Sequence, residues 1–169
     1  MENRMIRNNT QDLPGAAKAQ DASRAVPAPA IFVAVLLVGM LLSLAFPVSF
    51  LPRVITLLVG AACFLLPLAL GLAALRTMRH ARTSVNPNRP TTVLLTGGPF
   101  RMSRNPIYLG MVVQYVGLAL LFNSLWAIVL LPLALVVVHF TVIKREERYL
   151  EQKFGEEYRV YKTRVRRWI

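Results

Sequence analysis

A polar segment between two apolar runs, residues 96–110, holds the first group of side chains that could do chemistry. It opens with a glycine-rich turn at 97–99, which lets the backbone pass close to another group. Asn105 then stands at the N-cap position of a helix whose first residue is a proline. A helix starting there places Arg104 and Tyr108 on one side, beside free backbone N–H groups that can bind an anion.

The same helical stripe continues through Met111 to Tyr115, and Gly110 leaves room for close approach of a helix or a ligand. This pattern also has a simpler reading. Arginine and tyrosine are common anchors where a helix meets the membrane surface, so a well-capped membrane helix would show the same residues. The pattern alone is compatible with both.

Two adjacent carboxylates, Glu146 and Glu147, form the second group. They follow an apolar run and lie among basic residues, and anchoring to a membrane does not require them. A continuous helix would place His139 two turns before Glu146 on the same face. His139 is the only ionisable residue within the predicted spans, and such residues often mark function. The alternative is a histidine that hydrogen-bonds neighbouring backbone or a tyrosine.

The remaining reactive residues argue against several classes of site. His80 and His139 are the only histidines, so no metal site is predicted. Cys63 is the only cysteine and lies inside an apolar run, which excludes a secreted disulfide scaffold. The sequence has no phosphate-binding glycine loop and no dinucleotide fingerprint.

The elements that position these groups are indicated by composition. The 169 residues are 55% hydrophobic, yet 20 lysines and arginines face only 8 acids. The charges are segregated, because the stretches 26–52, 54–75 and 105–143 carry none. A water-soluble nucleic-acid binder would spread its bases over its surface, so that class is excluded and no nucleic-acid partner is predicted. The sequence predicts a small integral membrane protein.

The apolar stretches are long enough for four membrane-spanning helices, since about 20 residues cross the hydrocarbon core. The longest stretch is divided at Asn123 and Ser124, which favour a turn. The predicted fold is all-α, with four transmembrane helices in two antiparallel hairpins and an amphipathic helical tail. The predicted spans are 29–47, 54–75, 106–122 and 125–143.

Orientation follows from the basic residues, which gather on the cytoplasmic side of membrane proteins. Nineteen of the 20 lie in the tail 1–27, the loop 76–105 and the tail 144–169, and only Arg53 lies on the other side. Both termini are therefore predicted to be cytoplasmic, in the inner membrane of a bacterium. The tail 1–27 has no periodicity and is predicted to be disordered.

The second tail, 144–169, has an apolar stripe opposite its bases. Gly155 is predicted to end its first helix. One reading is a surface helix held to anionic lipid headgroups, which needs no other ligand. The other is a tail that folds back over the mouth of the helix bundle and closes a pocket. The apolar residues recur every three or four positions at Leu150, Phe154, Tyr158, Tyr161, Val165 and Trp168.

Taken in order, two motifs separated by a membrane hairpin resemble a known family. The first motif reads Gly98-Pro99-Phe100-Arg101-x-x-Arg104-Asn105-Pro106-x-Tyr108-x-Gly110. The second reads Glu146-Glu147-x-x-Leu150-x-x-x-Phe154-Gly155-x-x-Tyr158-x-x-Tyr161. Together they resemble the isoprenylcysteine carboxyl methyltransferases and, equally, the related phospholipid N-methyltransferases. The resemblance covers about half the chain, from residue 90 onward.

The resemblance implies an integral membrane methyltransferase that uses S-adenosylmethionine without a Rossmann domain. A lipophilic acceptor would enter sideways from the membrane, and segment 144–169 would complete the cofactor pocket. The catalytic residues it implies are Arg104, Asn105 and Glu147. The acceptor-binding residues it implies are Tyr115, His139 and Arg104. The cofactor-binding residues it implies are Gly98, Pro99, Arg101, Arg104, Asn105, Tyr108, Gly110, Glu146 and Glu147.

One departure from the family bears on the acceptor. Many members have histidine where this chain has Asn105, and an asparagine cannot shuttle a proton near neutral pH. An acceptor that arrives ionised, such as the carboxylate of a prenylcysteine-like substrate, is therefore favoured. A phospholipid amine and a small thiol remain open as acceptors. A non-catalytic lipid-binding adaptor is the alternative from another class, and a transporter subunit ranks last.

Overall fold

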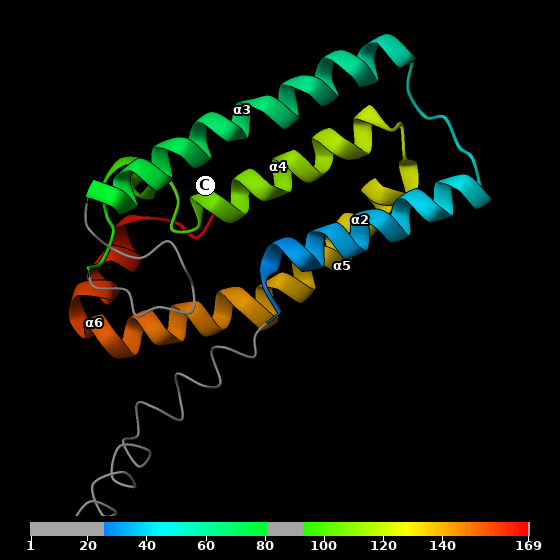
Figure 1. Ribbon diagram of the computed structural model, residues 1–169. Coiled ribbons are helices and arrows are strands. Elements are labelled where there is room, and N and C mark those ends of the chain that lie inside the picture. The colour runs from blue at the N-terminus through cyan, green and yellow to red at the C-terminus, as the bar shows by residue number, and fades with distance from the viewer. Residues whose placement is uncertain (1–25, 81–92, 169) are drawn as a thin grey trace, which may run out of the picture.

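The computed structural model describes residues 26–80 and 93–168. Most of the tail predicted to be disordered, and much of the predicted loop 76–105, lie outside these residues. Every regular element in the described ranges is helical, as the sequence predicts (Figure 1). The elements are α2 (Ala28–Ala45), α3 (Arg53–His80), the 3₁₀ helix η1 (Gly98–Arg101), α4 (Pro106–Leu121), α5 (Leu125–Val138), the π-helical turn η2 (His139–Ile143) and α6 (Lys144–Arg164).

Three helices in the described ranges are long and apolar enough to cross a membrane: Ala28–Ala45, Arg53–Thr77 and the first part of Leu125–Arg164. The fourth apolar helix, Pro106–Leu121, is shorter. Their outer surfaces carry large exposed side chains, such as Leu44 at 80%. Burying a leucine is worth about 1.5–3 kcal/mol, so a surface of this kind suits lipid rather than water. The chain is a membrane protein.

The turn that divides the longest apolar stretch is where the sequence places it. Asn123 has a φ of 50°, and Ser124 caps α5 by accepting a hydrogen bond from the backbone N–H of Ala127 at 3.1 Å. The Asn123 side chain donates to the carbonyl of Leu51 at 3.1 Å. The turn after α4 is thereby tied to the connection between α2 and α3.

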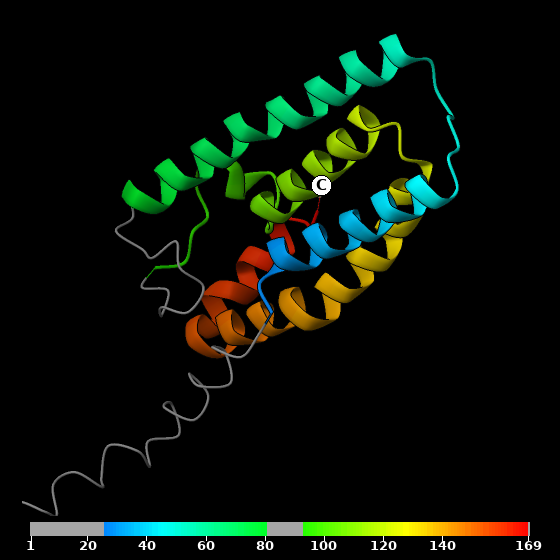
Figure 2. The same cartoon turned by 45° about the vertical axis from the view of Figure 1, so that its right-hand side comes forward.

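The helices pack differently from two tight hairpins. The main contacts join α3 to α4 and α2 to α5, so each helix packs mainly against one from the other pair (Figures 1 and 2). Small residues make these contacts close. A Cβ atom on Gly117 of α4 would lie 2.6 Å from the backbone nitrogen of Phe64. A Cβ on Gly39 of α2 would lie 2.6 Å from the Cα of Ala127.

The passage from α5 to α6 differs from the continuous α-helix that the sequence suggested. Residues His139–Ile143 form a π-helical turn, which changes the register of everything that follows. The expected alignment of His139 with Glu146 on one α-helical face therefore does not apply. Further on, Gly155 has a φ of 52° and breaks α6, as predicted, but helix resumes after it.

Candidate active site

A buried ion pair joins the two polar segments at one end of the bundle. Arg104 lies just before α4, and its Nη1 donates to Oε1 of Glu147, in the first turn of α6, at 3.1 Å. The two side chains are only 11% and 12% exposed. Arg167 adds two hydrogen bonds of 2.8 Å, from Nε to Oε1 and from Nη2 to Oε2 of Glu147. One carboxylate is thus held by two guanidinium groups.

The backbone after α6 docks on the segment before α4. The backbone N–H of Arg104 donates to the carbonyl of Arg166 at 3.0 Å. The hydroxyl of Ser103 donates to the carbonyl of Arg167 at 3.1 Å. The side-chain amide of Asn105 donates to the same carbonyl at 3.3 Å. The chain after α6 therefore folds back onto the segment before α4, the course that the second of the two readings of this tail describes; that it closes a pocket stays a prediction.

Asn105 occupies the predicted N-cap position, but its side chain makes no cap hydrogen bond to α4. Its amide is engaged with the carbonyl of Arg167 instead, and its backbone N–H donates to the Ser103 hydroxyl at 3.1 Å. The helix start is defined by Pro106, which needs no donor at this position. Asn105 therefore holds the returning chain in place and does not cap the helix.

Glu146 faces a different partner from its neighbour. The Tyr108 hydroxyl donates to Oε2 of Glu146 at 2.9 Å, linking the first turn of α4 to that of α6. Although the residue as a whole keeps contact with solvent, its carboxylate is crowded by the surrounding protein. Burial raises the pKa of Glu146, the Tyr108 hydrogen bond opposes the rise, and the Glu147 charge adds to it. No cation in the described residues pairs with Glu146.

Arg104 keeps one donor free. Its Nε is buried and has no hydrogen-bond partner among the described residues. A buried unpaired donor costs about 1–3 kcal/mol, so such a group commonly marks a place for a ligand. Tyr158 lies close by and is 1% exposed; burial raises the pKa of its hydroxyl, and the neighbouring Arg104 guanidinium opposes the rise, first by hydrogen bonding and then by its charge. The site therefore combines a free donor with an unpaired carboxylate.

Tyr161 fixes the segment that leads into the site. Its hydroxyl donates to the carbonyl of Phe100 in η1 at 2.6 Å, and burial raises its pKa to about 12, so the phenol stays protonated. Tyr158 and Tyr161 form a small apolar cluster with Leu94. The second part of α6 is thereby attached to the chain between α3 and α4.

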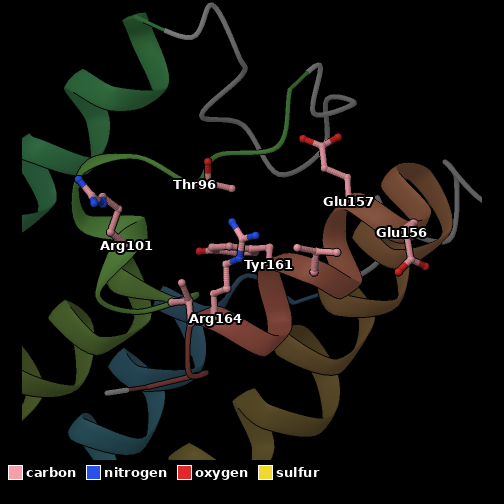
Figure 3. Close-up of a pocket in the computed structure, with 8 residues that line it drawn as sticks. Thr96, Arg101, Glu156, Glu157, Tyr161 and Arg164 are labelled. Atoms are coloured by element: carbon pink, nitrogen blue, oxygen red, sulfur yellow. The ribbon is translucent and has the colours of Figure 1, made fainter.

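A cavity of about 660 Å³, lined by both charged and apolar side chains, lies between the segment before α4 and the second part of α6 (Figure 3). In Figure 3, Arg101 stands on one side, Glu156 and Glu157 on the other, and Tyr161 and Arg164 between them. Arg101 was predicted to share a pocket with the Glu146–Glu147 pair. The structure places it in the wall of this cavity, which neither Glu146 nor Glu147 lines.

A second cavity, of about 420 Å³, is apolar and lies between α4 and α5. Trp168 forms part of its wall and also packs against the main hydrophobic core. Trp168 directly follows Arg167, so the segment that carries Arg167 also forms part of the wall of this cavity. The other lining residues are Leu109, Val112, Leu135, Val136, His139 and Phe140.

The predicted site residues therefore separate into groups. Five come together at the mouth of the bundle: Arg104, Asn105, Tyr108, Glu146 and Glu147. We call them, with Arg167, the polar cluster. His139 lies in the wall of the neighbouring apolar cavity, where its ring meets the edge of Phe140.

Other predicted residues have packing roles in the structure. Tyr115 is buried, donates to the carbonyl of Ala127 at 2.8 Å and packs near Phe32, so it belongs to the core. Gly110 is buried against Pro67 of α3, where a Cβ would have an ordinary contact of 3.6 Å. Gly98 turns with a φ of 57° against Thr77 of α3. Pro99 follows it and is buried. These residues shape the bundle around the polar cluster.

Sequence reasoning missed Ser103 and the role of Arg167. Arg167 lies among several bases that were all assigned to topology and lipid binding, and nothing in that run distinguishes it. No group of three or more histidine, cysteine, aspartate or glutamate side chains in the described ranges is placed to hold a metal ion.

The region that carries most of this site matches a known protein family. Residues 55–157, more than half of the chain, match the family described as phospholipid methyltransferase. The chain belongs to the phospholipid methyltransferase family. This assignment agrees with the resemblance given by the two motifs, and the matched region includes all of the polar cluster except Arg167. The chain is therefore a member of a family of membrane methyltransferases.

The individual relatives align with shorter parts of this chain than the family does. An uncharacterised protein of Haemophilus influenzae is 53% identical over 47 residues, which are 28% of this chain and 73% of that one. The nickel-cobalt-cadmium resistance protein NccN of Alcaligenes xylosoxydans xylosoxydans is 35% identical over 68 residues, 40% of this chain and 32% of its own length. The cobalt-zinc-cadmium resistance protein CzcN of Cupriavidus metallidurans is 32% identical over 68 residues, which are again 40% of this chain and 32% of its own length. No solved structure matches the chain.

Proposed function

We propose that this protein transfers a methyl group from S-adenosylmethionine to a lipophilic acceptor at the cytoplasmic face of the membrane. The observation that carries the proposal is the polar cluster itself. It holds a carboxylate without a cationic partner and a guanidinium with a free donor, and the chain continues from its Arg167 into the wall of an apolar cavity. Family membership supports the same chemistry.

The residues present fit this cofactor. Its amino group and sulfonium are cationic, and Glu146 is the carboxylate of the cluster that no cation in the described residues holds. Its carboxylate needs donors, and the buried Nε of Arg104 is one. Glu147 is already held by Arg104 and Arg167, so we assign it to shaping the site and not to proton transfer. When bound, the cofactor supplies an already activated methyl group.

The chain has few groups that could transfer a proton, and methyl transfer to an ionised acceptor requires no proton transfer. Methyl transfer to an ionised acceptor needs alignment and exclusion of water, and proximity can supply about 7–11 kcal/mol. The amide of Asn105 cannot act as a base. We therefore propose a carboxylate acceptor of the prenylcysteine type, with its hydrocarbon part in the apolar cavity that His139 and Trp168 line. A phospholipid amine is the alternative that the family name favours.

The proposed membrane arrangement is based on the apolar helices and the distribution of basic residues. We propose four crossings, α2 to α5, with both termini and the polar cluster on the cytoplasmic side of a bacterial inner membrane. The distribution of bases supports this, since only Arg53 lies at the other end. The exposed bases of α6 would bind anionic headgroups.

Binding of S-adenosylhomocysteine to the detergent-purified full chain tests the proposal. Calorimetry should show saturable binding that Glu146→Gln weakens at least about tenfold, as loss of a charged partner implies. Glu151→Gln is the matched control, because the ion pairs of Glu151 are with Arg159 and Lys162, two bases of its own helix. Absence of saturable binding to the unmodified chain contradicts the proposal.

A further inference from the structure

Arg167 holds Glu147 more completely than Arg104 does. Its Nε and Nη2 each lie 2.8 Å from a different oxygen of the carboxylate, whereas Arg104 reaches only Oε1, at 3.1 Å. Oε2 of Glu147 has no partner other than Arg167 among the described residues. Arg167 itself is 35% exposed, whereas Glu147 is 12% exposed. The contact therefore compensates a nearly buried carboxylate, and the guanidinium could be hydrated without it.

The position of Arg167 is set independently of its side chain. The carbonyls of Arg166 and Arg167 accept hydrogen bonds from three groups of the segment before α4, at 3.0 to 3.3 Å. Val165 is extended, so the chain leaves α6 and runs back toward α4. On the other side, Trp168 packs into the core. The backbone on both sides of Arg167 is therefore held in place. This fixes where its guanidinium group lies and allows it to make both hydrogen bonds to the Glu147 carboxylate.

We propose that Arg167 is a positioning residue of the active site that fixes the orientation of Glu147. Glu146 is then the carboxylate that remains available to a cationic ligand. Arg167 also couples the polar cluster to Trp168 and through it to the apolar cavity. This inference rests on the proposed function for its ligand but not for its geometry. It differs from the reading of Arg167 as one more base that binds anionic lipid.

Removing the guanidinium has a specific electrostatic consequence. Tyr108 and Glu147 act on Glu146 directly, and Tyr158 lies near it. Arg104 and Arg167 lie one step further away, against the carboxylate of Glu147. Without Arg167, the negative charge of Glu147 is compensated by Arg104 alone. Glu146 then ionises at a higher pH, so binding of a cationic group to it shifts to higher pH as well.

The sequence supplies a matched control. Arg166 carries the same charge, is exposed, and takes part in the docking only through its backbone carbonyl. Arg166→Ala therefore removes one cationic side chain and keeps the backbone contact. A lipid-binding role predicts equal effects for Arg166→Ala and Arg167→Ala. A positioning role predicts an effect for Arg167→Ala alone.

The experiment uses the full chain in detergent with Trp126→Phe, so that Trp168 is the only tryptophan. Two quantities are measured for each variant: the emission maximum of Trp168, and the affinity for S-adenosylhomocysteine from pH 5 to 8. Arg167→Ala should move the emission to longer wavelength, weaken binding about tenfold and shift its pH dependence upward. Arg167→Lys should restore part of the affinity, because it returns the charge without the two-bond geometry.

The outcomes separate the two proposals. If the unmodified chain binds no S-adenosylhomocysteine, the proposed function fails, and the emission of Trp168 still tests the coupling to Arg167. If Arg167→Ala does not fold, Arg167→Lys gives the same comparison with a smaller expected shift. Equal emission, affinity and pH dependence for the Arg167 and Arg166 variants would overturn the positioning role.

Discussion

Arg104 and Glu147 are 43 residues apart in the sequence and form an ion pair of 3.1 Å in the structure. All of α4 and α5 lies between them. The pair therefore joins the segment before α4 to the first turn of α6, at the end of the bundle where both helices begin. Its strength depends on both helices and on the docked segment after α6.

Loss of Arg104 should destabilise the protein. Arg104→Ala leaves the nearly buried Glu147 with one cation, and breaking a buried pair costs about 3 kcal/mol. Thermal unfolding in detergent measures the change. Arg159→Ala is the control, because Arg159 is 63% exposed and its pairs span 3.5 and 3.6 Å, so its removal should cost less than about 1 kcal/mol. Similar losses for both variants would contradict the buried role of Arg104.

Cofactor binding should strengthen as the pH rises through the pKa of Glu146. That pKa is raised by burial, so the carboxyl is protonated over a wider acidic range than usual and cannot pair with a cation there. The same shift means that protonated Glu146 favours the fold below its unfolded pKa, a contribution lost as the pH rises through the folded value. Titration calorimetry between pH 5 and 8 measures the affinity. Glu146→Gln should bind weakly and without this dependence.

The close contact of α3 with α4 should not tolerate a methyl group at Gly117. A Cβ there would lie 2.6 Å from the backbone nitrogen of Phe64, which cannot move without shifting the helix. Gly117→Ala should lower stability by about 1–3 kcal/mol. Gly71→Ala is the comparison, since a methyl group there would meet nothing within 4 Å and alanine favours the helix. Unfolding of the two variants in denaturing detergent should diverge, and equal stability would contradict the packing.

Filling the apolar cavity should block the acceptor and spare the cofactor. Val112→Phe places a larger side chain in the space of about 420 Å³ that Trp168 also lines. Methyl transfer to a prenylated acceptor should fall at least about tenfold, with binding of S-adenosylhomocysteine nearly unchanged. Val129→Phe changes an exposed position on α5 and should leave both quantities as they were. A parallel loss of cofactor binding would show that the cavity is not reserved for the acceptor.

The features that the sequence predicts well depend on local chemistry. The helix start at Pro106, the turn at Asn123 and the break at Gly155 all follow from the backbone preferences of single residues. The grouping of Arg104 with Glu147 came from a family resemblance, and the structure brings these two side chains together.

The features that could not be predicted depend on contacts between distant segments. The π-helical turn His139–Ile143 is made of the same residue types as an α-helix, so no local sequence pattern predicts it. Arg167 stands among similar bases, and only the docking of its backbone singles it out. Tyr115 lies on the same helical stripe as Tyr108, yet its hydroxyl donates to the carbonyl of Ala127 in the next helix. This contact between two helices cannot be predicted from the sequence of either one.

The exchange of partners between the helix pairs bears on how the chain assembles. The helices α2 and α3 are made first, but their main contacts are with α5 and α4. During synthesis the first two helices are therefore without their main partners until α4 and α5 have been made. α3 gains its neighbour one helix later, whereas α2 waits until α5 is complete. Assembly is therefore a late, concerted step, and a chain interrupted before α5 would leave α2 without its principal contact.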